Sequence, residues 1–427
     1  MTTRTPIKFQ RLILIGISVS LGMLITSTVA NAHKPITSKY TYNEHIYPIV
    51  KSSCGSCHRN GGLGPMSLLT YEEAYPWAQA IKEEVVSLTM PPWKSEEGFG
   101  DLRRPHALTP REIDILVEWC NGGTPEGKTS ISTKSPNSKS NFDMDEPDLI
   151  VGMPLNYTLN ENTSEATRFF VLSLDLKRER WIQAIDIRPG NSSIVRTVTL
   201  FADNSGKAKL LDSKDPGLGF SSADDTDLAL ETILALWLPG QQPMQLRDRA
   251  AYHLPAGSDL VLRIQYKKNW TNEGSKMTDQ TSVGMYFLEN QPAEQVQIIV
   301  LSSLQVQSVG GTIKFKHQIE QDIDVLSLLP RLSATVAQLQ VEVTMPNESK
   351  ETILLLSQPT PDWASQYWLE SPLSLPQGSW IEVSITPEYS NAKSTTTDET
   401  GTMTTPLQLR LDYVAHKRTA YLNTTVH

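Results

Sequence analysis

The sequence predicts a multidomain protein in which a small all-α domain is followed by an all-β region of tandem sandwiches. Three observations lead to this prediction. First, the chain has 427 residues, which is more than one hydrophobic core normally serves. Second, helix-boundary signals and one-face helical spacing lie within residues 40–127. Third, beyond residue 141 the apolar residues alternate in short runs separated by Pro, Gly, Asn and Asp, which is typical of β-sandwiches.

The first residues carry the pattern of a secretory signal. Three basic residues, Arg4, Lys8 and Arg11, precede an apolar stretch over residues 12–29, and small residues that suit signal peptidase follow it. The apolar stretch contains Ser and Thr and falls short of the ~20 strongly apolar residues of a spanning helix. An uncleaved anchor is therefore the weaker alternative. We expect residues 1–32 to be a signal peptide, and the mature protein to be periplasmic with no integral membrane span.

A small all-α domain is expected over residues 33–127. Residues 42–53 have helical character and run into a cysteine motif. Residues 70–89 show the one-face spacing of a second helix, but Pro76 would disturb it, so the helix could begin there instead.

The third helix of this domain has the clearest boundary signals. Thr109 is a good N-cap, Pro110 suits the first helical position, and Glu112 completes a capping box with Thr109. Gly122-Gly123 ends the helix. Cys120 falls on its predicted buried stripe, where we expect a small packed hydrophobe rather than a reactive thiol.

A linker is expected at residues 128–146, because residues 128–141 are almost entirely Ser, Thr, Lys, Asn and Pro. Strand-like runs follow it. They are 169–176, 181–187, 193–202, 259–268, 282–288, 339–344 and 380–386. The roughly 270 residues of this region exceed the ~100 of one sandwich. We therefore expect a first β-sandwich at 147–290 and a second at 291–420.

The motif with the strongest chemical meaning is Cys54-Gly-Ser-Cys57-His58. Two thiols at this spacing can add to both vinyl groups of one haem, and the following His then lies under the iron as its proximal ligand. A zinc site would need further thiols or paired histidines nearby, and a redox CxxC would follow a strand rather than a short helix. We therefore expect one covalently bound haem c, held by Cys54, Cys57 and His58.

The sixth iron ligand is expected to be Met90. This residue is followed by Pro91-Pro92-Trp93, and the consecutive prolines hold the chain extended, as is needed to keep a thioether against iron. Met66 is the main rival, and His106 or an open site are further alternatives. A Met/His pair raises the reduction potential and closes the iron to small molecules, which favours electron transfer over catalysis at the haem.

Short motifs along the chain carry a family resemblance. In the N-terminal part they are Gly61-Gly62, Gly64-Pro65-Met66-Ser67-Leu68-Leu69-Thr70-Tyr71, Met90-Pro91-Pro92-Trp93, Leu108-Thr109, Trp119 and Gly122-Gly123-Thr124-Pro125-Glu126-Gly127. In the β region they are Glu146-Pro147-Asp148-Leu149, Arg188-Pro189-Gly190, Trp237-Leu238-Pro239-Gly240, Leu254-Pro255-Ala256-Gly257-Ser258-Asp259-Leu260, Asp362-Trp363 and Leu375-Pro376-Gln377-Gly378.

Together these motifs resemble bacterial exported proteins in which a cytochrome c domain precedes a module similar to copper type II, ascorbate-dependent monooxygenases of the peptidylglycine α-hydroxylating class. The resemblance spans nearly the whole mature chain and is looser after residue 290. It implies that the two sandwiches are jelly-roll-like. It also implies that Met90, in the Met-Pro-Pro-Trp motif, is the distal haem ligand.

The positions where this resemblance implies copper ligands hold other residues. Arg196-Thr197 stand where paired histidines are implied, and Gln265 and Lys267 stand where a His-x-His pair is implied. A Pro-His-Met-His stretch appears as Pro330-Arg331-Leu332-Ser333. Copper needs imidazoles or thioethers, and neither Arg nor a charged Lys has a lone pair to offer. We therefore expect no copper centre, which makes a non-enzymatic role the favoured one and leaves the enzyme question open.

Three functions follow from these expectations. The favoured one is a periplasmic c-type cytochrome that passes single electrons to or from a redox partner protein, with the monooxygenase-like β module binding a partner or a ligand. A copper-dependent monooxygenase fed electrons by the haem is the first alternative, and a haem-based sensor is the second. The formal net charge of −9 argues against a nucleic-acid partner, which would need a basic face.

Overall fold

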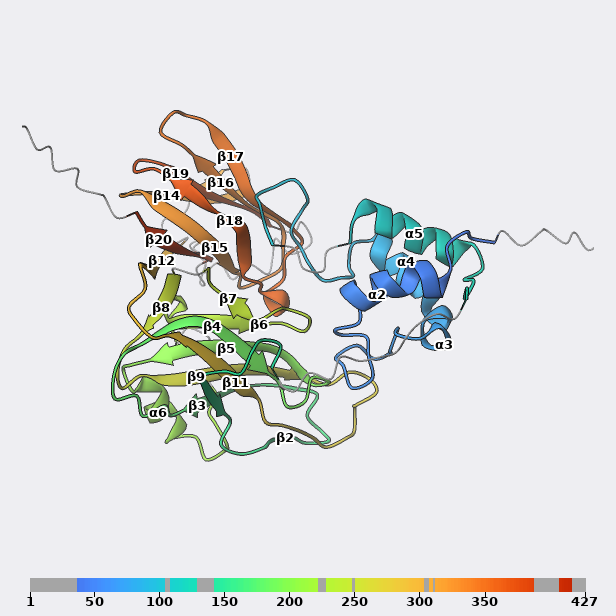
Figure 1. The fold of residues 1–427 in the computed structure, drawn as a ribbon, viewed down its shortest axis with the longest axis horizontal. Helices are drawn as coiled ribbons and strands as arrows, with labels where there is room; N and C mark the ends of the chain where they lie inside the picture. The colour runs from blue at the N-terminus through green and yellow to red at the C-terminus, as the bar shows by residue number, and fades with distance from the viewer. Residues whose placement is uncertain are drawn as a thin grey trace, which may run out of the picture.

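The computed structural model describes residues 37–103, 108–128, 142–221, 228–247, 250–302, 307–309, 312–387 and 407–416. A small helical unit lies beside a larger β region that is built mostly of two sandwiches (Figure 1). At this coarse level the predicted order of a helical part and then an all-β part is confirmed. The predicted signal peptide, most of the predicted linker, and His106 lie outside the described residues.

The helical unit opens with a continuous helical run over residues 42–53, as predicted. The π-helical turn η2 (Tyr42–Ile46) leads directly into α2 (Tyr47–Ser53). The second predicted helix is divided around Pro76 into α3 (Tyr71–Ala74), η3 (Tyr75–Trp77) and α4 (Ala78–Val86). It ends earlier than predicted, at Val86, and Leu88 beyond it has a positive φ of 56° and is exposed.

The last helix, α5 (Pro110–Asn121), has the predicted capping box. The Glu112 amide donates to the Thr109 hydroxyl, and the Thr109 amide donates to Glu112 Oε2 at 2.8 Å. Cys120 is partly buried and packs against this core, as expected of a small packed hydrophobe, and burial raises the pKa of its thiol to about 11. Leu116 and Trp119 fill the centre of the buried face.

The first sandwich encloses one apolar core between two sheets. One sheet has the order β3 (Glu165–Leu172), β9 (Asp259–Lys267), β5 (Val195–Asp203) and β6 (Ile233–Trp237). The opposing strands are β1 (Leu149–Gly152), β11 (Ser282–Leu288), β4 (Arg180–Arg188) and β8 (Ala250–Leu254), with β7 (Met244–Gln245) beside β4. The predicted alternation in β9 is confirmed, since Leu260, Leu262, Ile264 and Tyr266 are all fully buried in this core.

The second sandwich repeats this arrangement. Its outer sheet has the order β13 (Gln307–Val309), β14 (Thr312–Gln318), β19 (Trp380–Pro387), β16 (Val336–Thr344) and β17 (Lys350–Ser357). The opposing strands are β12 (Glu294–Ser302), β20 (Gln408–Ala415), β15 (Ile323–Arg331) and β18 (Tyr367–Leu375). The apolar side chains of both layers form a second core.

The two sandwiches share one nine-stranded sheet. Strand β12 pairs antiparallel with β20 along its length, and it also pairs in parallel with β8 through Glu294 and Gln295. The sheet therefore runs from β1 of the first sandwich to β18 of the second. Short elements complete the β region: β2 (Tyr157–Leu159), β10 (Met277–Asp279), α6 (Lys207–Asp212), η5 (Leu230–Thr232) and η7 (Pro361–Trp363).

A loop of the helical unit, residues 94–103, is bound to the second sandwich by backbone hydrogen bonds. The amide of Glu96 donates to the Leu355 carbonyl at 2.8 Å, and the amide of Arg103 donates to the Trp368 carbonyl at 2.8 Å. Gly100 allows this close approach, because a Cβ there would lie 2.1 Å from the carbonyl oxygen of Ile353. The helical unit is thus held against the β region rather than tethered only through the linker.

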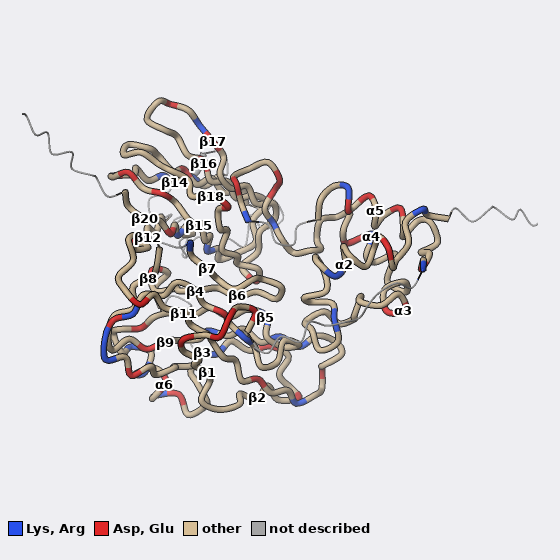
Figure 2. Tube along the Cα trace, in the orientation of Figure 1, with Lys and Arg blue, Asp and Glu red and all other residues tan. Residues whose placement is uncertain are grey.

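Acidic and basic residues are interspersed along the helical unit and both sandwiches (Figure 2). Within the described ranges, no helix combines the length and hydrophobicity that a bilayer crossing would require.

Candidate functional site

The cysteine motif lies at the end of α2, where the sequence places it. Cys54 is the C-cap residue of this helix, and its amide donates to the Val50 carbonyl. The chain then turns back on itself, because the amides of Cys57 and His58 both donate to the Cys54 carbonyl, at 3.1 and 2.8 Å. This tight turn brings both thiols and the imidazole to one wall of a cavity.

That cavity has a volume of about 520 Å³ and opens between the helical unit and the β region. Its size is within the ~300–1,000 Å³ of cofactor and ligand pockets. Most of the helical side of the wall is apolar. The apolar lining residues there are Leu63, Pro65, Met66, Leu68, Trp77, Ala80, Ile81, Val85, Met90, Pro91, Pro92 and Trp93. The structure therefore brings Cys54, Cys57, His58 and Met90, the four predicted site residues, to the same cavity.

His58 is held in an orientation that suits a metal ligand. Its Nδ1 atom lies 3.3 Å from the carbonyl oxygen of Met66, so the Nδ1–H tautomer donates there and Nε2 keeps its lone pair. Burial lowers the pKa of His58, which favours the neutral imidazole that binds metals. Gly64 packs against this ring, because a Cβ on Gly64 would lie 2.6 Å from His58 Nδ1.

The two thiols differ from those of a redox-active CxxC. Burial raises the pKa of Cys54 to about 12, and burial also raises the pKa of Cys57. Catalytic cysteines of dithiol oxidoreductases have lowered pKa values, because the thiolate is the reactive form. The environment of this pair therefore argues against thiol–disulfide exchange as its role.

The candidates for a sixth ligand are placed differently. Met90 follows α4, lines the cavity and is 41% exposed. Met66 also lines the cavity, and its carbonyl oxygen is the partner of His58 Nδ1. His45, a further histidine of the helical unit, accepts a hydrogen bond from the Thr41 amide at 3.2 Å at the start of η2. Both methionines therefore line the cavity, whereas His45 is not among its lining residues.

The β region supplies part of the cavity wall, which the sequence alone did not predict. The residues that it contributes are Arg196, Pro239, Lys267, Lys268, Asn269 and Trp363. The thiol of Cys57 lies 3.7 Å from the carbonyl oxygen of Pro239. In the neighbouring loop, Asn269 Nδ2 donates to the Leu63 carbonyl at 3.1 Å. The only sequence signal was that several of these residues lie in or beside the motifs that carry the family resemblance.

Two of the three stretches implied to hold copper ligands, at residues 196–197 and 265–267, lie close together at this interface. Strands β5 and β9 pair Thr197 with Gln265, and the Thr197 hydroxyl donates to Gln265 Oε1 at 3.4 Å. Arg196 and Lys267 flank this pair and line the cavity. These four side chains provide no imidazole and no thioether. Across the described residues, no cluster of three or more His, Cys, Asp or Glu side chains is placed to hold a metal ion.

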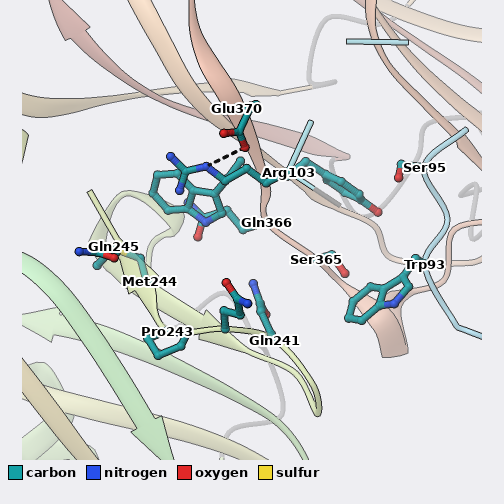
Figure 3. A pocket seen from close by; sticks show the side chains of 13 residues that line it. Trp93, Ser95, Arg103, Gln241, Pro243, Met244, Gln245, Ser365, Gln366 and Glu370 are labelled. Atoms are coloured by element: carbon teal, nitrogen blue, oxygen red, sulfur yellow. Dashed lines mark ion pairs between the residues drawn. The ribbon is translucent and has the colours of Figure 1, made fainter. Parts of the chain in front are cut away.

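A second cavity of about 400 Å³ lies where the helical unit meets both sandwiches (Figure 3). Glutamine side chains from the β6–β7 connection, among them Gln241, face Gln366 and Trp93 across it. Arg103 approaches Glu370 at 3.8 Å on its upper side in this view. Trp93 lines both cavities, so the two cavities are neighbours.

No family model matches the chain, and no curated protein matches it. Some solved structures are similar over much of it. The major capsid protein P2 of bacteriophage PM2 is 9% identical over 64% of this chain and 98% of that chain, with a TM-score of 0.22. Allantoicase is 11% identical over 58% and 77%, with a TM-score of 0.19, and the cowpea mosaic virus top component is 7% identical over 68% and 95%, with a TM-score of 0.26. Scores this low carry no argument, so the functional conclusion depends on the site itself.

Proposed function

We propose that the protein is an exported c-type cytochrome that transfers single electrons through one haem. In this proposal Cys54 and Cys57 hold the haem through thioether bonds, His58 is the proximal iron ligand, and Met90 is the distal one. The β region binds the redox partner or a further ligand. A haem with Met/His ligation supplies reversible one-electron chemistry while both axial positions stay occupied.

The observation that carries the proposal is the convergence of these four side chains on one apolar cavity. Three features of the chain fit the group. Both thiols line the cavity with pKa values raised by burial, the imidazole has its Nδ1 atom engaged so that Nε2 is left for iron, and most of the helical side of the wall is aliphatic or aromatic. Neither a zinc site nor a redox dithiol accounts for all three.

The two alternative functions have less support. A copper monooxygenase needs imidazole or thioether ligands in the β region, and the positions implied for them hold Arg196, Thr197, Gln265 and Lys267. A haem-based sensor needs an open or labile sixth position, and Met90 is available on the cavity wall to occupy that position. Electron transfer is therefore the function that this set of residues suits best.

The proposal is tested on the full chain produced in a host that matures c-type cytochromes. We expect one iron per chain, no stoichiometric copper, haem that stays bound under denaturing conditions, and a low-spin spectrum typical of Met ligation. Of the three cysteines, only Cys120 should then react with a thiol reagent in denaturant. A chain that retains three reactive thiols after maturation contradicts the proposal.

A matched pair of variants compares the roles of Cys57 and Cys120 in haem attachment. Cys57→Ser should leave haem attached weakly or not at all, whereas Cys120→Ser should leave attachment and spectrum unchanged, because Cys120 lies outside the cavity wall. Stoichiometric, tightly bound copper would favour the monooxygenase. Rapid binding of carbon monoxide to the reduced wild type would favour the sensor.

A further inference from the structure

All basic side chains on the described wall of the larger cavity come from the β region. They are Arg196, Lys267 and Lys268. The only carboxylate that the helical unit contributes to the described wall is that of Glu84, and the helical unit contributes no Lys or Arg there. The cavity is therefore apolar toward the helical unit and positively charged toward the β region.

Arg196 is the best placed of these cations. It lies at a register shift of β5, where Val195 pairs with Tyr266 and Thr197 pairs with Gln265, so that Arg196 is the extra residue of a β-bulge. A bulge redirects a side chain away from the regular alternation of the strand.

The guanidinium of Arg196 is held in position by a ring from the other sandwich. Its central carbon lies 4.6 Å from the centroid of the Trp363 ring, which belongs to η7 and lines the same cavity. Its Nε atom is buried and has no hydrogen-bond partner among the described groups. A guanidinium that lies over an aromatic ring and has an unpartnered Nε–H is suited to receive a carboxylate.

The two lysines differ in how closely their ammonium groups are already bound by other groups of the protein. Lys268 is buried and donates to the carbonyls of Asn160 and Glu161, at 2.5 and 3.3 Å. Lys267 is partly exposed, and its ammonium approaches Glu165 at 3.5 Å, which is long for an ion pair. Lys267 is therefore free to reorient, whereas Lys268 contributes mainly a fixed positive charge.

We propose that Arg196, assisted by Lys267, binds a propionate of the haem, so that the β region completes the haem site. This inference rests on the proposed function. A covalently held haem brings two carboxylates into this partly buried cavity, and such charges are costly unless they are paired. The apolar helical wall and Glu84 offer no cation to pair with them, so the carboxylates are favoured on the side of Arg196.

This arrangement makes the reduction potential depend on the β region. A positive charge near the haem disfavours the oxidised iron, which carries the greater positive charge, and it neutralises a carboxylate that would stabilise that state. Loss of Arg196 should therefore lower the midpoint potential. Because the site is partly buried, the shift should persist at high salt, where exposed charges are screened.

The test measures the midpoint potential of the haem-loaded full chain by spectroelectrochemistry. We expect Arg196→Gln to shift the ratio of oxidised to reduced haem roughly tenfold toward the oxidised form, which is ~59 mV lower for a one-electron couple. Arg196→Lys keeps the charge and should recover most of the potential. Lys350→Gln removes an equal charge from an exposed ion pair with Glu342 and should leave the potential unchanged.

A second variant keeps the inference testable if Arg196→Gln does not fold. Lys267→Gln alters a partly exposed side chain and should lower the potential in the same direction by a smaller, few-fold change in the ratio. If both variants keep the wild-type spectrum and the wild-type potential, the inference is overturned and the proposed function stands. If the wild type attaches no haem, the proposed function fails and the inference fails with it.

Discussion

The Nδ1 atom of His58 lies 3.3 Å from the carbonyl oxygen of Met66. This contact selects the tautomer that leaves Nε2 unprotonated. It engages the backbone of Met66, while the side chains of Met66 and Met90 both remain available on the cavity wall. In the proposed haem site the prolines that follow Met90 favour this residue over Met66 as the distal ligand.

The first prediction concerns these two methionines. Met90→Ala should abolish the spectral signature of thioether ligation, lower the midpoint potential, and allow the reduced protein to bind carbon monoxide, because the distal position is then open. Met66→Ala should retain all three wild-type properties, since the carbonyl that contacts His58 is unchanged. Absorption spectra of both variants, reduced with and without carbon monoxide, measure the difference. The reverse pattern would assign the ligand to Met66.

The second prediction concerns the space beside the proximal imidazole. A Cβ added at Gly64 would lie 2.6 Å from Nδ1 and 2.9 Å from Cγ of His58, so the ring or the loop must shift. We expect Gly64→Ala to cost about 1–3 kcal/mol of stability and to lower the yield of haem-loaded protein. Gly152→Ala is the control, because its Cβ would meet no atom closer than 3.4 Å. Thermal unfolding and haem content should change in the first variant only.

The parts of the site that lie close together in the sequence were predictable. The spacing of Cys54, Cys57 and His58 encodes local chemistry, and the prolines after Met90 indicate a constrained segment. The contribution of Arg196 and Trp363 was not predictable, because they are far from the motif in the chain and from each other. Only the folding of both sandwiches against the helical unit brings them to the same cavity.

The same distinction applies to the fold, where local features were predictable from the sequence and long-range strand pairing was not. Capping residues such as Thr109 act within one turn of helix, and the alternation in β9 reports burial directly, so both were visible in the sequence. The shared sheet was not visible, because the pairing of β12 with β8 involves only Glu294 and Gln295, and these residues follow a Pro- and Asn-containing segment that resembles a domain boundary. Strand pairing across sandwiches depends on tertiary contacts that local periodicity does not encode.

A buried polar network joins the two sandwiches beside this shared sheet. Asp412 accepts hydrogen bonds from Arg410 Nε at 2.6 Å, from the Tyr252 hydroxyl at 2.7 Å, and from Gln366 Nε2 at 2.7 Å. Arg410 also donates to two backbone carbonyls of the first sandwich, at 2.7 and 2.6 Å. Both charged side chains are almost fully buried, at 1% and 0% exposure. Asp412 is thus the carboxylate that balances a buried guanidinium.

The third prediction follows from that balance. Asp412→Asn keeps the shape of the side chain but leaves the charge of Arg410 buried without its counterion, which should cost on the order of 3 kcal/mol. Asp324→Asn is the control, because Asp324 pairs with the half-exposed His416 at 2.7 Å and such pairs contribute about 0–1 kcal/mol. Urea titration gives both free energies of unfolding. Equal, small losses in the two variants would show that Arg410 needs no buried partner.

The fourth prediction concerns stability at acid pH. Hydrogen bonds from the Gly217 amide, the Arg168 side chain and the Ser221 amide lower the pKa of Asp215 to about 2, from an ordinary value of 3.8. Because the folded-state pKa is the lower one, the ionised Asp215 stabilises the fold above about pH 4, and this contribution is lost as the pH falls toward about 2. Asp215→Asn should therefore lower the Tm at neutral pH, with the difference from wild type disappearing near pH 2.

Asp212→Asn should instead raise the Tm at neutral pH. Burial and the nearby Asp215 charge raise the pKa of Asp212, so its ionisation opposes folding. Thermal unfolding across this pH range measures both variants, and a deficit of Asp215→Asn that does not depend on pH would contradict the assignment.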